Sequence, residues 1–117
     1  MKLSSKIHGI IDYLVVIFLI AAPTLFELPE TTACFTYILA GVHFVLTILT
    51  NFEVGIIKII PFNIHGIIEF IVSLALFGIA YYFGNTEGDL SRNFYIGFGI
   101  AVFLTWAITD YKKGITS

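Results

Sequence analysis

Four apolar stretches, each long enough to cross a membrane as a helix, occupy most of this chain. They run roughly over residues 7–26, 33–52, 62–83 and 93–110, and about 18 to 20 residues suffice for a helix to cross the hydrocarbon layer. The composition agrees, because 58% of the residues are hydrophobic and only 12% are charged, whereas soluble domains carry about 25% charged residues. The 117 residues therefore predict an all-α fold, an integral membrane bundle of four helices.

The positive charges predict how this bundle is oriented. With the N-terminus inside the cell, only Arg92 falls on the outer side, and the cytoplasmic side holds Lys2, Lys6, Lys58, Lys112 and Lys113. Lysine and arginine are enriched in the cytoplasmic loops of membrane proteins. We therefore expect a multi-pass protein of the inner (cytoplasmic) membrane with both termini in the cytoplasm. We also expect the apolar loop around Lys58 to lie in the cytoplasmic membrane interface, through Ile56, Ile57, Ile59 and Ile60.

Two nearly identical heptads open the first and third apolar stretches. Residues 7–13 read IHGIIDY and residues 64–70 read IHGIIEF, 57 positions apart. The similarity continues into the second stretch of each half, where residues 41–47 align with 99–105 and residues 50–56 align with 109–115. The duplicated unit is therefore a whole helical hairpin.

This duplication predicts the domain organisation. We expect a single transmembrane domain over residues 1–117, made of one repeat over 1–60 and a second over 61–117. Because each unit contains two spans, both copies enter the membrane from the same side. They would form a parallel repeat about an axis along the membrane normal. The glycines of the heptads, Gly9 and Gly66, are expected to let helix backbones approach closely.

The first half also carries a short pattern of residues that occurs in a known family. A glycine stands early in the first stretch, the segment Leu19-Ile-Ala-Ala-Pro-Thr-Leu-Phe26 closes it, and Gly41 lies in the second stretch. In these features the chain resembles the SPW repeat family of small bacterial four-helix membrane proteins, with Ala22-Pro23-Thr24 in place of the Ser-Pro-Trp signature. The resemblance covers most of the first hairpin and implies the fold only, since the family has no settled biochemical activity.

Few residues within the apolar stretches can carry chemistry. His8 and Asp12 are four positions apart, as are His65 and Glu69, so each pair lies on one face of its helix and can touch. Because the two heptads match, we expect these four residues to face one another across the repeat axis, toward the cytoplasmic side. They are the primary candidate site, a polar intramembrane cluster. The secondary candidates are His43, Asn51, Glu53 and Asp110.

Three interpretations of this cluster are open from the sequence. In the first, each histidine and acid pair is structural and holds the helices in register. In the second, Asp12 and Glu69 handle protons or cations, because ionisable residues inside a membrane often mark such paths. In the third, the histidines and carboxylates hold a metal, or His43 holds a haem. Binding of a lipid or a quinone is a further alternative.

The first interpretation predicts a structural or accessory component of a membrane assembly, with no catalytic residues and no cofactor. Such a protein would sit in the lipid bilayer as a homo-oligomer or as a subunit of a larger membrane-protein complex. The other interpretations predict a proton or cation transporter, or a redox protein that binds a metal or haem. A net charge of −2 and the lack of a basic patch beyond the inner lysines argue against nucleic acid as a partner.

Overall fold

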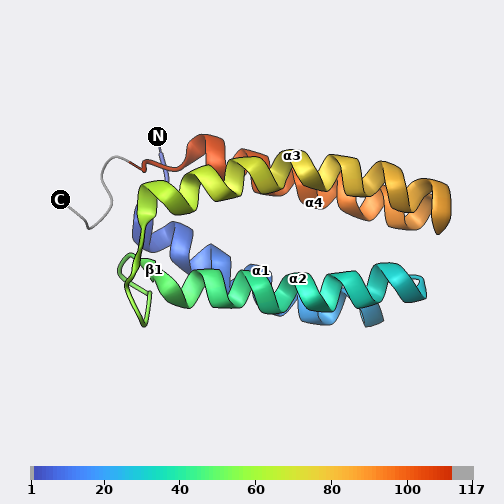
Figure 1. Cartoon of the computed structure of the whole chain (residues 1–117), viewed down its shortest axis with the longest axis horizontal. Coiled ribbons are helices and arrows are strands. Elements are labelled where there is room, and N and C mark those ends of the chain that lie inside the picture. The colour runs from blue at the N-terminus through green and yellow to red at the C-terminus, as the bar shows by residue number, and fades with distance from the viewer. Residues whose placement is uncertain (1, 112–117) are drawn as a thin grey trace.

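Each of the four apolar stretches forms a helix in the computed structural model, which describes residues 2–111 (Figure 1). The helices are α1 (Ser5–Leu25), α2 (Glu30–Leu49), α3 (Phe62–Thr86) and α4 (Asp89–Ile108), and two short strands between α2 and α3 are β1 (Thr50–Asn51) and β2 (Ile60–Pro61). The prediction of an all-helical chain with four helices is confirmed.

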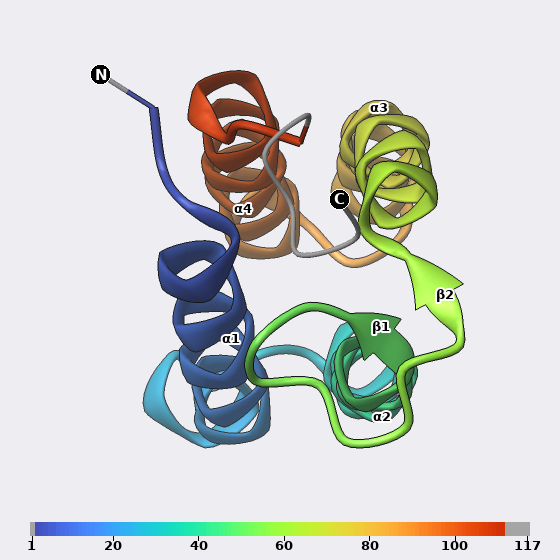
Figure 2. The ribbon, with the colours of Figure 1, turned by 90° about the vertical axis from the view of Figure 1, so that its left-hand side faces the viewer.

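The helices form two hairpins. Close helix packing occurs between α1 and α2 and between α3 and α4, and the end-on view places α1 diagonally opposite α3 (Figure 2). The sequence sets the helix starts. The Ser4 hydroxyl caps α1 by accepting a hydrogen bond from the Ile7 amide at 3.2 Å, and Pro29 and Pro61 stand directly before α2 and α3. These positions suit proline, because the first amides of a helix have no partner within the helix.

Three of the four helices, α1, α2 and α3, are long and apolar enough to cross a membrane. The fourth, α4, has a comparable length of 20 residues, but its first turns carry polar residues that lower the mean hydropathy: Asp89, Ser91, Arg92 and Asn93. The length and composition of three helices thus support the prediction that this is a membrane protein.

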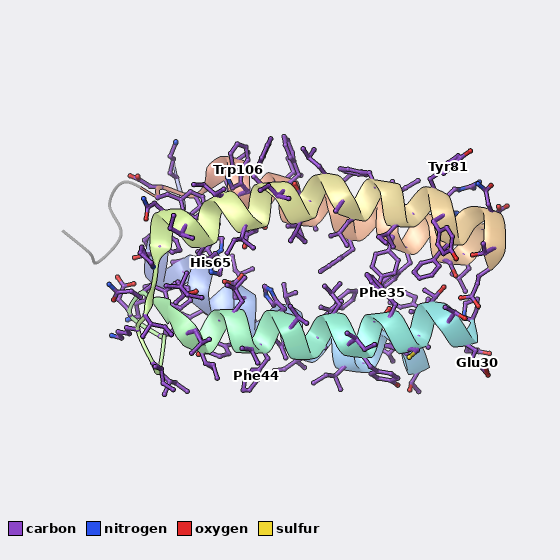
Figure 3. All side chains as sticks on the ribbon, in the orientation of Figure 1. Glu30, Phe35, Phe44, His65, Tyr81 and Trp106 are labelled. Atoms are coloured by element: carbon purple, nitrogen blue, oxygen red, sulfur yellow. The ribbon has the colours of Figure 1, made fainter. Side chains whose placement is uncertain are left out.

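The distribution of side chains is the reverse of that in a soluble bundle. Large apolar residues such as Leu14 (58% exposed) and Ile17 (63% exposed) cover the outside. Phe44 and Tyr81 also point away from the bundle, whereas Phe35 and His65 lie between the two hairpins (Figure 3). Among the described residues, about as many polar as apolar side chains are buried. Such a surface suits contact with lipid, because monomeric soluble proteins rarely expose large continuous apolar patches.

Both hairpins are tied together at one end of the bundle, where the described chain also begins and ends (Figure 1). Strand β1 pairs in parallel with β2, with Thr50 opposite Ile60. In the same way Leu3, just before α1, pairs in parallel with Thr109, just after α4. The loop between β1 and β2 exposes Ile56 (71%) and Ile59 (67%), an apolar surface of the kind that the interface prediction requires.

The other end of the bundle has an apolar core with a polar rim. Leu76, Ala80, Phe83 and Tyr95 form the buried core. At the rim, Glu87 follows α3 and accepts hydrogen bonds from the Thr32 amide and hydroxyl and from the Thr31 amide. Glu87 thereby caps α2, whose own preceding residue supplies no side-chain cap. These bonds, those from Thr32 first, lower the pKa of the Glu87 carboxyl.

Candidate functional site

The four primary candidates lie together in the interior, at the end of the bundle that holds the strands. His8 and Asp12 come from α1, and His65 and Glu69 come from the diagonally opposite α3. All four are buried, and one ligand atom from each lies within 4.8 Å of the other three. We call these four residues the tetrad. The i, i+4 spacing directs each pair inward, and the diagonal packing of the helices brings the two pairs together.

Within the tetrad each histidine Nε2 faces one oxygen of each carboxylate. The Asp12 Oδ2 atom lies 3.4 Å from Nε2 of His8 and 3.2 Å from that of His65. The Glu69 Oε2 atom lies 3.0 and 3.2 Å from the same two nitrogens. The four separations are nearly equal, so the two nitrogens and two oxygens alternate around a ring of four atoms.

The hydrogen bonds of the tetrad are not shared equally between the two carboxylates. Both Nε2 atoms are hydrogen-bonded to Glu69 Oε2, whereas the buried Asp12 Oδ2 has no hydrogen bond. Buried carboxylate oxygens normally have a partner, because an unpaired one loses its hydration without compensation. Asp12 Oδ2 is therefore an unused acceptor that points into the tetrad.

Two threonines determine which nitrogen of each ring carries hydrogen. Thr109 Oγ1 lies 2.8 Å from Nδ1 of His8, and Thr50 Oγ1 lies 2.8 Å from Nδ1 of His65. Each hydroxyl donates its only hydrogen to a carbonyl one turn earlier, that of Thr105 or Leu46. It must therefore accept from the imidazole, so Nδ1 is the donor in both rings. A neutral ring then has its lone pair on Nε2, directed at the tetrad.

The net charge of the tetrad limits which protons or ions it can bind. With both rings neutral and both carboxylates ionised, four lone-pair atoms converge and the net charge is −2. Two protons, on the Nε2 atoms or on the carboxylate oxygens, can balance this charge, and so can one divalent cation among the four atoms. Burial of an uncompensated charge of this size in an apolar bundle is very costly. The tetrad therefore requires one of these two forms.

The dimensions of the tetrad suit a four-coordinate metal ion. An ion with bonds of about 2.1 Å separates adjacent ligand atoms by about 3.4 Å in a tetrahedron and by about 3.0 Å in a square. The four nitrogen–oxygen separations of 3.0–3.4 Å fall in this interval. The threonine hydroxyls supply the second contact that metal-binding histidines usually have on their other nitrogen.

Each carboxylate has a further neighbour at its second oxygen. The Tyr111 hydroxyl donates to Glu69 Oε1 at 2.9 Å, and burial together with the Glu69 charge raises the pKa of Tyr111, which keeps the hydroxyl protonated. His43 Nε2 lies 3.6 Å from Asp12 Oδ1, too far for a hydrogen bond. Of the secondary candidates, His43 is thus placed beside the tetrad.

The remaining secondary candidates lie outside the tetrad. Glu53, in the loop after β1, accepts a hydrogen bond from the Ser5 hydroxyl at 2.7 Å. Asn51 belongs to β1, and the Asp110 amide donates to the Leu3 carbonyl at 2.9 Å beyond α4. These residues help to join the two hairpins at this end of the bundle.

Side chains from the loop after β1 and from the segment after α4 cover the heptad glycines. A Cβ at Gly9 would lie 2.2 Å from Val54 Cγ2 and 3.0 Å from Phe52 Cε2, and a Cβ at Gly66 would lie 2.8 Å from Tyr111 Cδ1. The expectation that a second helix backbone packs against these glycines is therefore wrong, because side chains contact them instead. They make room for side chains that close the tetrad from the end of the bundle.

Sequence reasoning missed the roles of Thr50, Thr109 and Tyr111. The two threonines occupy aligned positions in the two halves of the sequence, and this was the signal that could have identified them. Tyr111 aligns with Phe52, so its hydroxyl has no counterpart in the first half. The structure shows its role only because it places this hydroxyl against Glu69.

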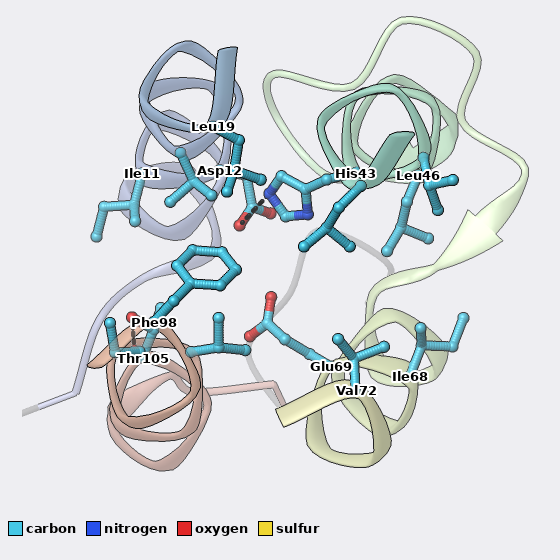
Figure 4. A pocket seen from close by; sticks show the side chains of 15 residues that line it. Ile11, Asp12, Leu19, His43, Leu46, Ile68, Glu69, Val72, Phe98 and Thr105 are labelled. Atoms are coloured by element: carbon cyan, nitrogen blue, oxygen red, sulfur yellow. Dashed lines mark hydrogen bonds and ion pairs between the residues drawn. The ribbon is translucent and has the colours of Figure 1, made fainter. Parts of the chain in front are cut away.

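A cavity of about 120 Å³ lies between the hairpins, next to the tetrad. Asp12, His43 and Glu69 form part of its wall, and Phe98 projects into the same space (Figure 4). The rest of the lining comes from all four helices and is apolar except for Thr105. One side of the tetrad thus faces an apolar space rather than packed side chains.

Comparison with protein families, with curated proteins and with solved structures finds no match to this chain. The resemblance to the SPW repeat family stays a prediction. The functional argument therefore depends on the geometry of the site.

Proposed function

We propose that this chain is an integral membrane protein that binds one divalent transition-metal ion in the tetrad of His8, Asp12, His65 and Glu69. The observation that carries the proposal is the convergence of four buried ligand atoms, one of which, Asp12 Oδ2, is a carboxylate oxygen without a hydrogen bond. A divalent cation would use this oxygen, both histidine lone pairs and Glu69 Oε2, and would neutralise the site.

The ligand chemistry narrows the choice of ion. Two imidazoles favour zinc, iron, copper or nickel over magnesium or calcium, and two carboxylates extend the range to manganese. No cysteine takes part, so the site lacks the soft ligands that select copper(I). Zn²⁺, Fe²⁺ and Mn²⁺ are the ions that fit this donor set best.

We further propose that all four helices cross the inner (cytoplasmic) membrane with both termini in the cytoplasm. Lys2, Lys6 and Lys58 belong to the end of the bundle that holds the tetrad, whereas Arg92 lies at the start of α4, at the opposite end. This asymmetry supports the orientation. Lys112 and Lys113 lie outside the described residues. Accessibility labelling would test this orientation with single cysteines introduced at Lys58 and Arg92 after replacement of the exposed Cys34 by serine. Only the cysteine at position 58 should react from the cytoplasmic side.

The duplication of a helical hairpin as a parallel repeat is part of this proposal. Two equivalent pairings support it: Leu3 with Thr109 and Ile60 with Thr50. Leu3 and Ile60 are separated by the same 57 positions as the heptads. Two equivalent histidine–threonine contacts accompany them. Each of these histidines thus contacts a threonine of the other half.

In the membrane, such a protein would act as a non-enzymatic component, either as a homo-oligomer or as a subunit of a larger assembly. The apolar residues that cover its outside support contacts with lipid and with other membrane helices. The metal ion would join α1 to α3 and fix the relative position of the hairpins. Native mass spectrometry from mild detergent would give the stoichiometry of the assembly.

The metal proposal is tested by elemental analysis and isothermal titration of the full chain in detergent. We expect one Zn²⁺ per chain, and at least about a hundredfold weaker binding after Asp12→Asn or Glu69→Gln, since each removes a charged ligand. The matched controls are Asp89→Asn and Glu30→Gln, which make the same changes on exposed residues and should bind like the parent. Tetrad variants that bind like the controls, or a parent that binds none of the three ions, would show that the tetrad is an ion-pair network that serves only the fold.

A further inference from the structure

The wall of the cavity beside the tetrad contains a second buried polar atom without a hydrogen bond. His43 Nε2 is buried and has no hydrogen bond, and its nearest charged neighbour, Asp12 Oδ1, is 3.6 Å away. Buried side-chain nitrogens are normally paired, because an unpaired one loses its bond to water without a replacement. His43 therefore offers one unused hydrogen bond at the polar end of an otherwise apolar cavity.

The size and lining of the cavity limit what can fill it. Its volume of about 120 Å³ is close to that of an engineered apolar cavity of about 150 Å³ that stays dry and binds benzene. Leu19, Leu39, Val72 and Phe98 belong to its apolar wall. A single six-membered ring is therefore of a size that this space can hold.

We propose that this cavity binds a one-ring phenol from the membrane, with the ring among the apolar side chains and the hydroxyl on His43 Nε2. A hydroxyl both donates and accepts a hydrogen bond, so it pairs with this nitrogen in either protonation state. An alkyl chain would fill the apolar wall but would leave the nitrogen unpaired. The proposal depends on the cavity and on His43, and a metal in the tetrad is not required for it.

The arrangement of the helices gives such a ligand a route from the lipid. Close helix packing is confined to the two hairpins, α1 with α2 and α3 with α4. The cavity lies between the hairpins and is lined by all four helices. In this proposal the ring enters where the hairpins meet, between α1 and α4 or between α2 and α3, with side chains such as Phe18 and Phe98 at the seam moving to admit it.

Isothermal titration of the full chain in detergent, with phenol and with benzene as probes, tests this proposal. The parent should bind phenol about tenfold more tightly than His43→Leu does, because the variant lacks the hydrogen bond. Benzene should bind both proteins with affinities within about twofold of each other, because the variant retains the apolar wall. A phenol affinity that is unchanged by His43→Leu would overturn the role of His43.

A cavity-filling pair of variants locates the binding. Val72→Phe places a ring inside the cavity and should abolish binding of both probes, whereas Leu74→Phe places it on the exposed side of the same helix and should leave binding unchanged. The unfolding midpoint and the zinc content of each variant are measured alongside. A folded Val72→Phe variant that still binds phenol like the parent would overturn the cavity as the site. A parent protein that binds phenol as expected but binds no zinc would contradict the metal proposal alone.

Discussion

The rings of His8 and His65 lie 5.3 Å apart between centroids and stand nearly perpendicular, at 84°. In this arrangement both Nε2 atoms point at the same oxygen, Glu69 Oε2. The rings come from diagonally opposite helices, and each is held by a threonine on its other nitrogen. The structure thus fixes the direction of both histidines from outside the tetrad.

These threonines should set the affinity for metal. Thr50→Val or Thr109→Val keeps the shape of the side chain but removes the acceptor for Nδ1–H, so the ring can rotate or move its hydrogen to Nε2. We expect each variant to bind Zn²⁺ about 10- to 100-fold more weakly in isothermal titration. Thr86→Val is the control, since Thr86 is exposed and bonds only its own helix. Affinities equal to that of this control would contradict the proposed role of the threonine hydroxyls.

The Tyr111 hydroxyl should contribute to stability through Glu69. Tyr111→Phe leaves the ring over Gly66 but removes the 2.9 Å hydrogen bond to Glu69 Oε1. We expect a loss of about 1 kcal/mol in the free energy of unfolding, measured by titration with a denaturing detergent. Tyr81→Phe, at a position that is 73% exposed, should be neutral. If both variants unfold alike, the Tyr111 hydroxyl has no net role in stability.

The heptad glycines should tolerate no added methyl group. Gly9→Ala and Gly66→Ala would place Cβ atoms 2.2 Å from Val54 Cγ2 and 2.8 Å from Tyr111 Cδ1, so the segments that cover the tetrad must move. Overpacking of this kind costs about 1–3 kcal/mol. Gly97→Ala is the control, because nothing lies within 4 Å of its added Cβ. The same denaturing titration should show a loss only for the first two variants, and an equal loss in all three would mean that the cost comes from the helix itself.

Glu87 should make the opposite end of the bundle sensitive to acid. The hydrogen bonds from Thr32 and Thr31 favour the carboxylate and lower the pKa of Glu87 below its ordinary value of 4.5. The folded state therefore binds the proton less tightly than the unfolded state does. The stabilisation is complete above the ordinary pKa and is lost as the pH falls through the lower folded pKa.

Replacement of Glu87 tests this pH dependence. Glu87→Gln should reduce the fall in unfolding midpoint between pH 6 and the acid limit, as followed by circular dichroism. Glu30→Gln, which changes an exposed carboxylate at the same end, should follow the parent. A Glu87→Gln profile that also overlays the parent would show that the cap does not couple to stability.

The sequence predicts the helices well, because a membrane span is a local property. Hydropathy nevertheless starts the second stretch at 33 and ends the third at 83, whereas α2 begins at Glu30 and α3 ends at Thr86. The added residues, such as Thr31, Thr32 and Asn85, are polar, and the helix continues through them beyond the apolar segment. Hydropathy follows the thickness of the lipid, and the helix follows its hydrogen bonds and its caps.

The candidate site was predictable in part for the same reason. The i, i+4 spacing identifies His8 with Asp12 and His65 with Glu69 from local geometry alone. The Thr109 contact to His8 and the Tyr111 contact to Glu69 span 101 and 42 positions of sequence. Such contacts depend on how the hairpins pack, which no local pattern specifies.

Removal of the metal should loosen the packing of the two hairpins. In the proposed bound state the ion is held by ligands from α1 and α3, and close helix packing is otherwise confined to each hairpin. An ion present at about 100 times its dissociation constant adds about 2.7 kcal/mol to the stability of the form that binds it. We expect EDTA to lower the unfolding midpoint of the zinc-loaded parent and to leave His65→Gln unchanged. If EDTA shifts both proteins equally, the zinc binds elsewhere on the chain and does not join the hairpins.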